Sequence, residues 1–200
     1  MNFTPWAITS PGPSFRLTLG AEQSGFMMSV GYDMYLKLLE EAVLEQKGEK
    51  KPVKTSCSAD LSVDAGIPES YVESPEQRMD LYRRIALIRN EEDADDMTDE
   101  LVDRFGDPPR SVNNLIQVAL MRGEAAEAGI TEITQKSGRM LFKVQDFDME
   151  LISALYQLPD FRGRLKVEAG TVPCVSLKLL TGDVIAQAVK FIRAWRGTKS

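Results

Sequence analysis

The sequence predicts an α+β fold: a small mixed or antiparallel sheet with helices packed mainly on one face, preceded by an extended N-terminal segment and one helix. Two observations lead to this class. Three amphipathic helical stretches follow one another between residues 74 and 128, and paired stretches of alternating apolar and polar residues come after them. Hairpins combined with grouped helices are typical of α+β proteins, in which helices cover the apolar face of the sheet.

The first 56 residues are predicted to lie outside the main domain. Residues 1–46 comprise an irregular stretch over 1–19, which holds three prolines and no hydrophobic period, and a helix over 29–46. Residues 47–56 form a proline-containing linker, whose lysines either contact phosphate or are simply solvated. The main domain is therefore placed at 57–196. The apolar stripe of the N-terminal helix consists of Tyr32, Tyr35, Leu36, Leu39 and Val43.

The main domain is predicted to begin with a half-buried strand and a well-capped helix. Apolar and polar residues alternate over 57–64, which favours a strand. Ser74 can cap the next helix, Pro75 suits its first position, and Gln77 completes a capping box. This helix is predicted to run to about Ile88. The acidic run that follows favours ion pairing over phosphate binding for its four arginines, Arg78, Arg83, Arg84 and Arg89.

A second helix is predicted over Met97–Pro109, after a break near residues 90–93. Gly106 stands where helices commonly end in left-handed geometry, and Pro108 prevents continuation. The apolar face of this helix is predicted to consist of Met97, Leu101, Val102 and Phe105.

The same helix has an acidic side. Glu100 and Asp103 are three residues apart and share a face, with Asp99 beside them. This side is either a solvated helix surface or a docking surface for a basic partner, and the charges alone do not decide between the two.

The C-terminal half is predicted to contain two hairpins and two further helices. Gly129 closes a third helix over 111–128. Gly138 forms the turn of a hairpin between strands over 130–134 and 139–144. There follow a short helix capped by Asp146 or Asp148 and stopped by Pro159, strands over 164–168 and 174–180, and a last helix over about 183–195.

The composition argues against several classes of function. The net charge is −6 and the isoelectric point is near 4.9, whereas nucleic-acid binders are usually basic, so no direct DNA binding is expected. The chain has no histidine, no phosphate-binding loop and no nucleophile elbow, so we expect no enzymatic activity. Cys57 and Cys174 lack metal-ligand spacing and are predicted to be buried in a reducing compartment. We expect a cytoplasmic protein with no membrane segment and no metal.

Four tracts, in this order, resemble the C-terminal end of bacterial transcription-repair coupling factors, the Mfd proteins. They are GAEQSGFMMSVGYDMYLKLLEEAV from residue 20, ADLSVDAGIPESYV from residue 59, QRMDLYRRIA from residue 77 and ELVDRFGDPP from residue 100. The likeness covers about residues 20–196 and is strongest over 20–46 and 59–123. Upstream of Gly20 the family has an arginine- and glycine-rich translocation loop, which this chain does not match.

The resemblance implies a part in transcription-coupled nucleotide excision repair. Family members are ATP-driven DNA translocases that displace stalled RNA polymerase and recruit UvrA. The helicase lobes that bind ATP and Mg have no match in this chain, so no cofactor is expected. Residues 57–196 resemble the autoinhibitory C-terminal module, which binds a UvrB-like N-terminal module. The resemblance places that contact on Glu100 and Asp103, and it makes Gln23 a remnant of the translocation motif shared with RecG.

Three functions stay open. The first is a non-catalytic, autoinhibitory interaction domain of a transcription-repair coupling factor. The second is a RecG- or Mfd-type helicase fragment that retains DNA- and ATP-linked activity, against which the lack of a phosphate-binding loop argues. The third is a functionless product of gene decay. Because full-length members of the family are several times longer, we expect a truncated or shifted gene product or a deliberately shortened chain.

Overall fold

The computed structural model describes residues 56–168 and 174–198 and confirms the α+β fold. The chain order is also the predicted one for this part of the chain: a strand, three helices, two strands, a helix, two more strands and a last helix. The helices are α3 (Pro75–Ile85), α4 (Glu91–Phe105), α5 (Arg110–Glu127), α6 (Met149–Gln157) and α7 (Val184–Thr198). The strands are β1 (Ser58–Asp60), β2 (Ile130–Lys136), β3 (Arg139–Val144), β4 (Leu165–Glu168) and β5 (Cys174–Lys178).

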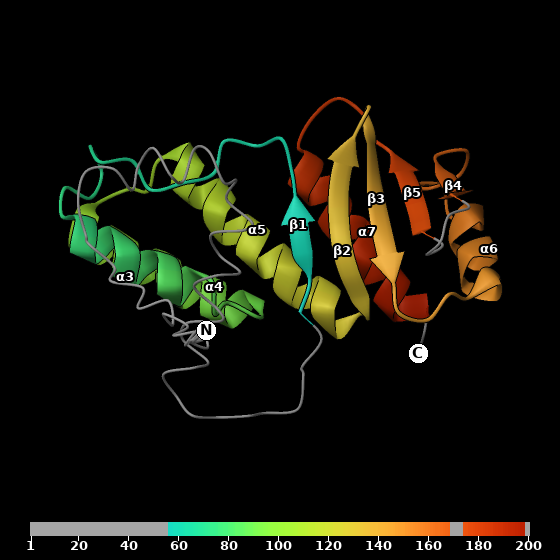
Figure 1. Ribbon diagram of the computed structural model, residues 1–200, viewed down its shortest axis with the longest axis horizontal. Helices are drawn as coiled ribbons and strands as arrows, with labels where there is room; N and C mark the ends of the chain where they lie inside the picture. Colours follow the sequence, from blue (N-terminus) through green and yellow to red (C-terminus); the bar gives the residue numbers. More distant parts are fainter. Residues whose placement is uncertain (1–55, 169–173, 199–200) are drawn as a thin grey trace, which may run out of the picture.

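The strands form one mixed sheet in the order β1-β2-β3-β5-β4 (Figure 1). β1 runs parallel to β2, and the other neighbouring strands are antiparallel. The β2–β3 hairpin turns at Ser137 and Gly138, whose φ angles are 51° and 73°. Positive φ at both central residues of a two-residue turn suits the twist of the strands, so Gly138 forms the turn that the sequence predicts.

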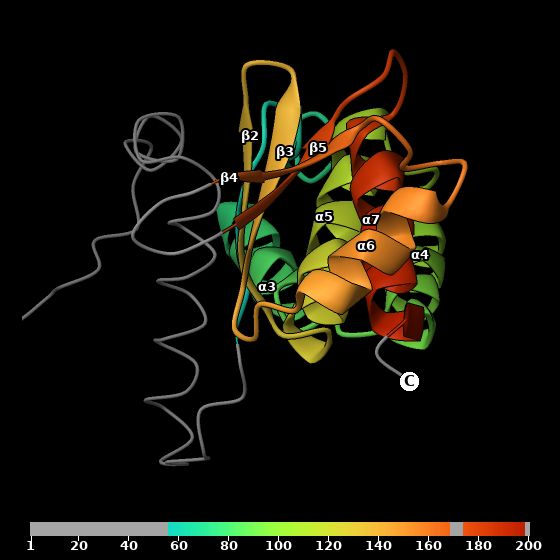
Figure 2. The same ribbon diagram turned by 90° about the vertical axis from the view of Figure 1, so that its right-hand side faces the viewer.

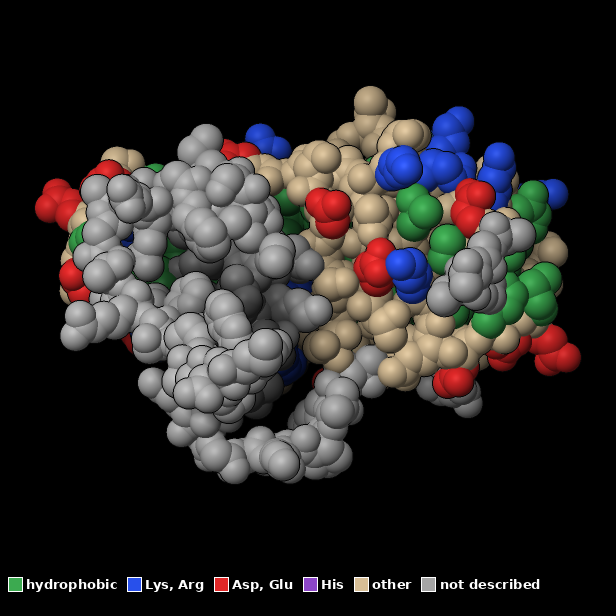
Figure 3. All heavy atoms as spheres, in the orientation of Figure 1, with side chains coloured by type: hydrophobic (Ala, Val, Ile, Leu, Met, Phe, Trp, Pro, Cys, Tyr) green, Lys and Arg blue, Asp and Glu red, His purple; other side chains and the backbone are tan. Residues whose placement is uncertain are grey.

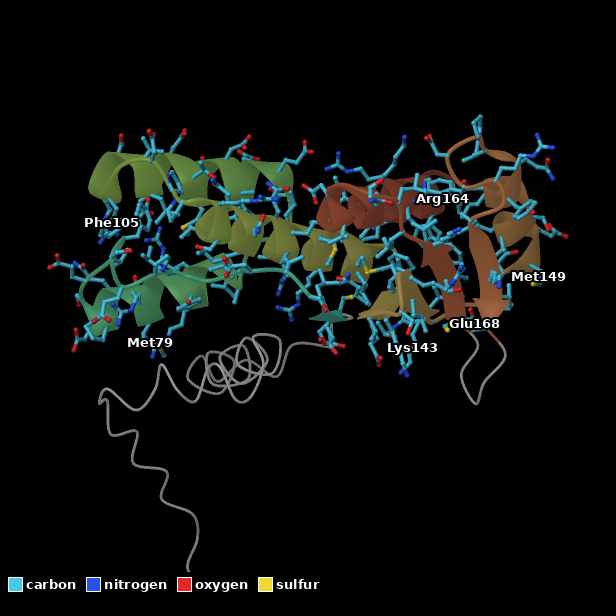
Figure 4. The ribbon with its side chains drawn as sticks, turned by 90° about the horizontal axis from the view of Figure 1, so that it is seen from above. Met79, Phe105, Lys143, Met149, Arg164 and Glu168 are labelled. Atoms are coloured by element: carbon cyan, nitrogen blue, oxygen red, sulfur yellow. The ribbon has the colours of Figure 1, made fainter. Side chains whose placement is uncertain are left out.

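Helices α5, α6 and α7 lie on one face of the sheet (Figure 2). Beneath them, Phe142 of β3 contacts Phe191 of α7, with ring centroids 4.3 Å apart, and Phe191 lies 5.9 Å from Trp195. These three side chains are fully buried and form the centre of the sheet core. On the other face Lys143 points away from the helices (Figure 4) and pairs with Glu132 at 2.6 Å. Charged side chains of both signs are interspersed over that face (Figure 3).

A second core lies between α3, α4 and α5, at the end of the molecule away from the sheet (Figure 1). α5 belongs to both cores, because Leu115 and Ile116 face α3 and α4 while Val118 and Met121 face the sheet core. The three consecutive helices therefore pack on one another, and only α5 continues beneath the sheet. The other main side chains of the helical core are Leu81, Ile85, Met97 and Leu101.

Several element boundaries fall short of the predicted ones, including the end of β5 at Lys178 instead of residue 180. Only Ser58–Asp60 of the strand predicted over 57–64 pairs with β2, and beyond it the Ser62 N–H donates to the Gln135 side chain at 3.0 Å. α3 ends at Ile85 rather than Ile88, because its last turn tightens. There the backbone N–H groups of residues 87 and 88 donate to carbonyls three residues earlier instead of four.

α4 departs most from the prediction. It begins at Glu91 rather than near Met97, because Asn90 caps it by accepting from the Asp93 N–H at 2.9 Å. Acidic side chains in the first turn favour a helix start through the helix dipole, so the acidic run is a helix beginning and not a break. Val102, predicted to lie on the apolar face, is 41% exposed and does not belong to the core.

The N-terminal predictions, which comprise the elements of residues 1–46 and most of the linker, lie outside the described residues.

Candidate partner-binding surface on helix α4

α4 has one face in the helical core and the opposite face in solvent. Ala94, Met97 and Leu101 are buried at helical spacing. The opposite face carries a line of exposed carboxylates, which we name the acidic stripe: Glu92, Asp95, Asp96, Asp99 and Asp103. Because an α-helix repeats about every 3.6 residues, these side chains follow one another along the helix axis.

The C-terminal end of α4 is fixed by Gly106 and Tyr71. Gly106 has a φ of 81°, and the Tyr71 hydroxyl lies 2.8 Å from its carbonyl oxygen and 3.3 Å from that of Leu101. Burial raises the pKa of Tyr71, so the hydroxyl keeps its proton. Phe105 is half-buried against the Tyr71 ring, at 5.9 Å between centroids, and the Arg104 guanidinium lies 5.0 Å above the Phe105 ring. The end of the helix is thus rigidly held.

Glu100 lies on the flank of α4 that faces α3. Its two carboxylate oxygens each accept a hydrogen bond from the Arg84 guanidinium, and one of them also accepts from Arg104 at 2.6 Å. These hydrogen bonds, first from Arg84 and then from Arg104, lower the pKa of Glu100 to about 2. Glu100 therefore clamps α3 to α4 within the domain.

Asp103 lies in a different setting. It is exposed in the acidic stripe, and within the described part of the chain no hydrogen bond or ion pair engages its side chain. The structure thus separates two carboxylates that the sequence places on one face. Glu100 is already occupied by two arginines, whereas Asp103 is open to a partner.

Sequence reasoning could have found only part of this arrangement. The spacing of Glu100 and Arg104 is the i,i+4 spacing of helical ion pairs, so that contact can be inferred from the sequence. The Arg84 contact joins two helices, and its only hint is the general expectation that the α3 arginines pair with nearby acids.

A third arginine ties the beginning of α4 to the sheet half of the molecule. Arg193 of α7 donates to Glu91 of α4 at 2.6 Å and to Glu124 of α5 at 2.7 Å. Hydrogen bonds from Arg193 to these carboxylates, Glu124 first, raise the pKa of Arg193. No local pattern predicts this bridge, since its partners are far apart in the sequence. It holds one end of the acidic stripe in place.

The other predicted site residue, Gln23, lies outside the described residues. Within the described ranges, no three His, Cys, Asp or Glu side chains come together as metal ligands would. No helix in these ranges is long and apolar enough to cross a membrane. Cys57 and Cys174 are both buried, as predicted.

Residues 61–152, which contain α3, α4, α5 and the β2–β3 hairpin, match the family model described as the TRCF domain. This part of the chain is thus similar to the TRCF domain. Two curated relatives, both named transcription-repair-coupling factor, support this similarity. The protein of Bacillus subtilis is 38% identical over 118 residues, and that of Staphylococcus haemolyticus is 37% identical over 120 residues. These matches cover 58% and 59% of this chain but only 10% of each relative.

A fold similar to this one has also been seen before. A crystal structure of the C-terminal domain of transcription-repair coupling factor is similar to this chain with a TM-score of 0.59. The similarity covers 74% of this chain and 96% of that one, at 18% sequence identity. At this identity the comparison speaks for the fold alone, and it agrees with the α+β architecture described above.

Proposed function

We propose that this chain is a non-catalytic, autoinhibitory interaction module of a transcription-repair coupling factor. In a longer protein it would bind a basic surface on a UvrB-like N-terminal module and so keep the UvrA-binding surface of that module covered. Release would follow engagement of RNA polymerase. The names of the relatives support a setting in transcription-coupled repair, and we place this chain in the cytoplasm as part of the proposal.

The acidic stripe carries this proposal. The buried face of α4 accounts for its packing, so the exposed carboxylates are not needed for the core. Like charges at i,i+4 on a helix destabilise it by roughly 0.2–0.5 kcal/mol per pair, and a basic partner would relieve that repulsion. Arginine suits such a partner, because its planar guanidinium can bind a carboxylate with two hydrogen bonds.

The two predicted contact residues have different roles in this proposal. Asp103 contacts the partner directly through its free carboxylate. Glu100 is bound by Arg84 and Arg104, so its main role is to orient α4. A partner would contact it only at the exposed edge of these ion pairs. Removing Asp103 should therefore weaken binding without affecting the fold, whereas removing Glu100 should affect both.

The decisive experiment measures the affinity of the chain for a purified UvrB-like module by isothermal titration calorimetry. Asp103→Lys should weaken binding at least about tenfold, or roughly 1.4 kcal/mol, and leave the melting temperature unchanged. Glu100→Lys combined with Asp103→Lys should abolish binding. Glu150→Lys is the matched control, because Glu150 is an exposed acid on α6, in the sheet half of the molecule. Equal affinity for Asp103→Lys and the Glu150 control would contradict the proposal.

The absence of catalysis is a separate part of the proposal. The purified chain should hydrolyse ATP no faster than background, with or without double-stranded DNA. Hydrolysis stimulated by DNA would favour the helicase-fragment alternative, in which ATP and Mg bind this chain itself. Failure to bind the UvrB-like module, together with no hydrolysis, would favour a product without function.

A further inference from the structure

Within residues 56–168 and 174–198, strand β4 is an edge of the sheet to which no further strand pairs. It pairs with β5 on one side, with Val167 opposite Val175, and it is the last strand in the sheet order (Figure 1). An exposed edge of this kind offers backbone N–H and C=O groups to a further strand. The edge is short, since β4 spans only Leu165–Glu168.

The hydrogen-bond register decides which residue of β4 faces outward. The Lys178 N–H donates to the Arg164 carbonyl at 2.9 Å, at the start of the β4–β5 ladder. Because backbone groups alternate between the two sides of an antiparallel strand, Lys166 and Glu168 also direct their backbone toward β5. The backbone N–H and C=O of Val167 therefore point to the free edge.

A groove accompanies this edge between α6 and β4. It has a volume of about 250 Å³, and its apolar lining residues, Ile152, Tyr156, Leu165 and Val167, stand beside the polar residues Ser153, Gln157 and Lys166. Tyr156 and Val167 are 43% and 41% exposed, and Met149 at the start of α6 is 56% exposed. Burial of such side chains against a partner is favourable at roughly 25 cal/mol per Å².

The outer face of the same strand carries two opposite charges. Lys166 and Glu168 are two residues apart, so both lie on the face away from the helices, where Figure 4 shows Glu168. Lys166 is exposed and has no ion pair among the described residues. Glu168 accepts a hydrogen bond from the Ser176 hydroxyl at 2.7 Å and lies 3.8 Å from Nε of Arg139, and its side chain is still 45% exposed.

We propose that β4 pairs with β4 of a second copy of this chain, antiparallel and centred on Val167. The two Val167 residues would exchange their N–H···O bonds, and Lys166 of each copy would then stand directly opposite Glu168 of the other. These cross-strand pairs are of opposite charge, and they lie at the closely spaced, non-hydrogen-bonded positions of the ladder. On the helix side, Val167 and Tyr156 of both copies would form one apolar strip.

Charge complementarity selects a second copy rather than another peptide. The Lys-Val-Glu order of residues 166–168 is complementary to itself when it is reversed about its centre. The interface involves one short strand and one helix face, so it belongs to the class of small, reversible contacts. We expect a dimer that forms with a dissociation constant on the order of 10–100 μM.

Sedimentation equilibrium of the 200-residue chain tests this arrangement. The wild-type chain should shift from monomer to dimer as its concentration rises through about 10–100 μM, the expected dissociation constant. Lys166→Glu should weaken the dimer roughly tenfold or more, because it sets the introduced carboxylate against Glu168 of the other copy at two places in each dimer. Glu168→Lys should do the same by setting two ammonium groups against each other.

The mixture of the two variants is the sharpest measurement. If the copies pair as proposed, a heterodimer of Lys166→Glu with Glu168→Lys has opposite charges at both cross-strand pairs. It then contains none of the like-charge pairs that weaken either homodimer. In that arrangement the introduced carboxylate of one copy stands opposite the introduced ammonium group of the other, and the remaining pair keeps Lys166 opposite Glu168. Mixing should therefore restore dimer formation to within about threefold of wild type.

Lys136→Glu is the matched control for these variants, since it changes the net charge equally at an exposed lysine of β2, and it should dimerise like wild type. Thermal melts establish that each variant is folded.

Several outcomes would overturn the proposal. They are a wild-type chain that stays monomeric at millimolar concentration, single variants that dimerise like wild type, and a mixture that does not recover. Val167→Pro, which removes the outward N–H at an edge position that tolerates proline, should also abolish the dimer. Since α4 lies at the opposite end of the molecule (Figure 1), Asp103→Lys should not change dimerisation, and the two proposals can fail independently.

Discussion

At the scale of single residues, Glu100 decides how the α4 surface should be understood. A carboxylate that looks free in the sequence is bound by Arg84 and Arg104 in the fold. Exposed ion pairs contribute little to stability, about 0–1 kcal/mol, but a carboxylate bound by two guanidinium groups is well ordered. Glu100 thus contributes to the rigidity of the surface, and Asp103 to its charge.

The lowered pKa of Glu100 makes this role measurable. The pKa is about 2 in the folded chain, compared with a usual value of 4.5. The ion pairs therefore stabilise the fold fully above a pH of about 4.5, and this contribution is lost as the pH falls toward about 2. Glu100→Gln should lower the free energy of unfolding by roughly 0.5–1 kcal/mol at neutral pH, a value already reduced for solvent screening. The effect should shrink as the pH falls from about 4.5 and vanish only below a pH of about 2.

Urea denaturation of wild type and variant across this pH range measures the difference. Asp103→Asn is the control, and its difference from wild type should stay near zero throughout. A Glu100→Gln effect that does not change with pH would mean that packing, and not charge, holds Glu100 in place.

At the scale of elements, the sequence predicts element types well and long-range contacts poorly. The Ser137-Gly138 turn and the Ser74 and Asp148 caps are local, so the residues at these positions predict them. The predicted start of α4 is wrong because an acidic run resembles a loop until its cap, Asn90, is recognised. The Arg193 bridge and the division of roles between Glu100 and Asp103 depend on tertiary packing, which no local pattern contains.

The crossing of α5 with the α3–α4 connection supplies a prediction at this scale. A Cβ added at Gly123 of α5 would lie 2.7 Å from both the Cα and the carbonyl oxygen of Arg89. Those atoms belong to the backbone and cannot move aside cheaply, so Gly123→Ala should cost about 1–3 kcal/mol.

Gly197 of α7 provides the matched control for this substitution. It is exposed, and nothing lies within 4 Å of its added Cβ, so Gly197→Ala should be neutral or stabilise the helix by up to about 1 kcal/mol. Thermal unfolding followed by circular dichroism gives both values. Equal effects at the two glycines would show that the close approach to Arg89 does not limit packing.

At the scale of the whole molecule, α5 makes two cores into one folding unit. Its residues line both the helical core and the sheet core, and Arg193 joins α7 to α4 and α5 across the boundary. Such sharing predicts cooperative unfolding, since neither core can lose α5 without exposing apolar surface in the other. This coupling also holds the acidic stripe and the β4 edge at fixed positions at opposite ends.

Leu101→Ala tests this cooperativity from one core to the other. Leu101 is fully buried in the helical core, so the substitution should cost about 2–5 kcal/mol. Trp195 is buried in the sheet core and reports from that side. The chain has two tryptophans, Trp6 and Trp195, so a Trp6→Phe background leaves Trp195 as the single fluorescent reporter. Its fluorescence should then show the full loss of stability in urea, with a midpoint that coincides with the one from circular dichroism. A different result would show that the two cores unfold separately and that α5 does not couple them. In that case the urea midpoint of Trp195 fluorescence would equal that of the Trp6→Phe chain with Leu101 intact, while the circular dichroism signal would be lost at lower urea.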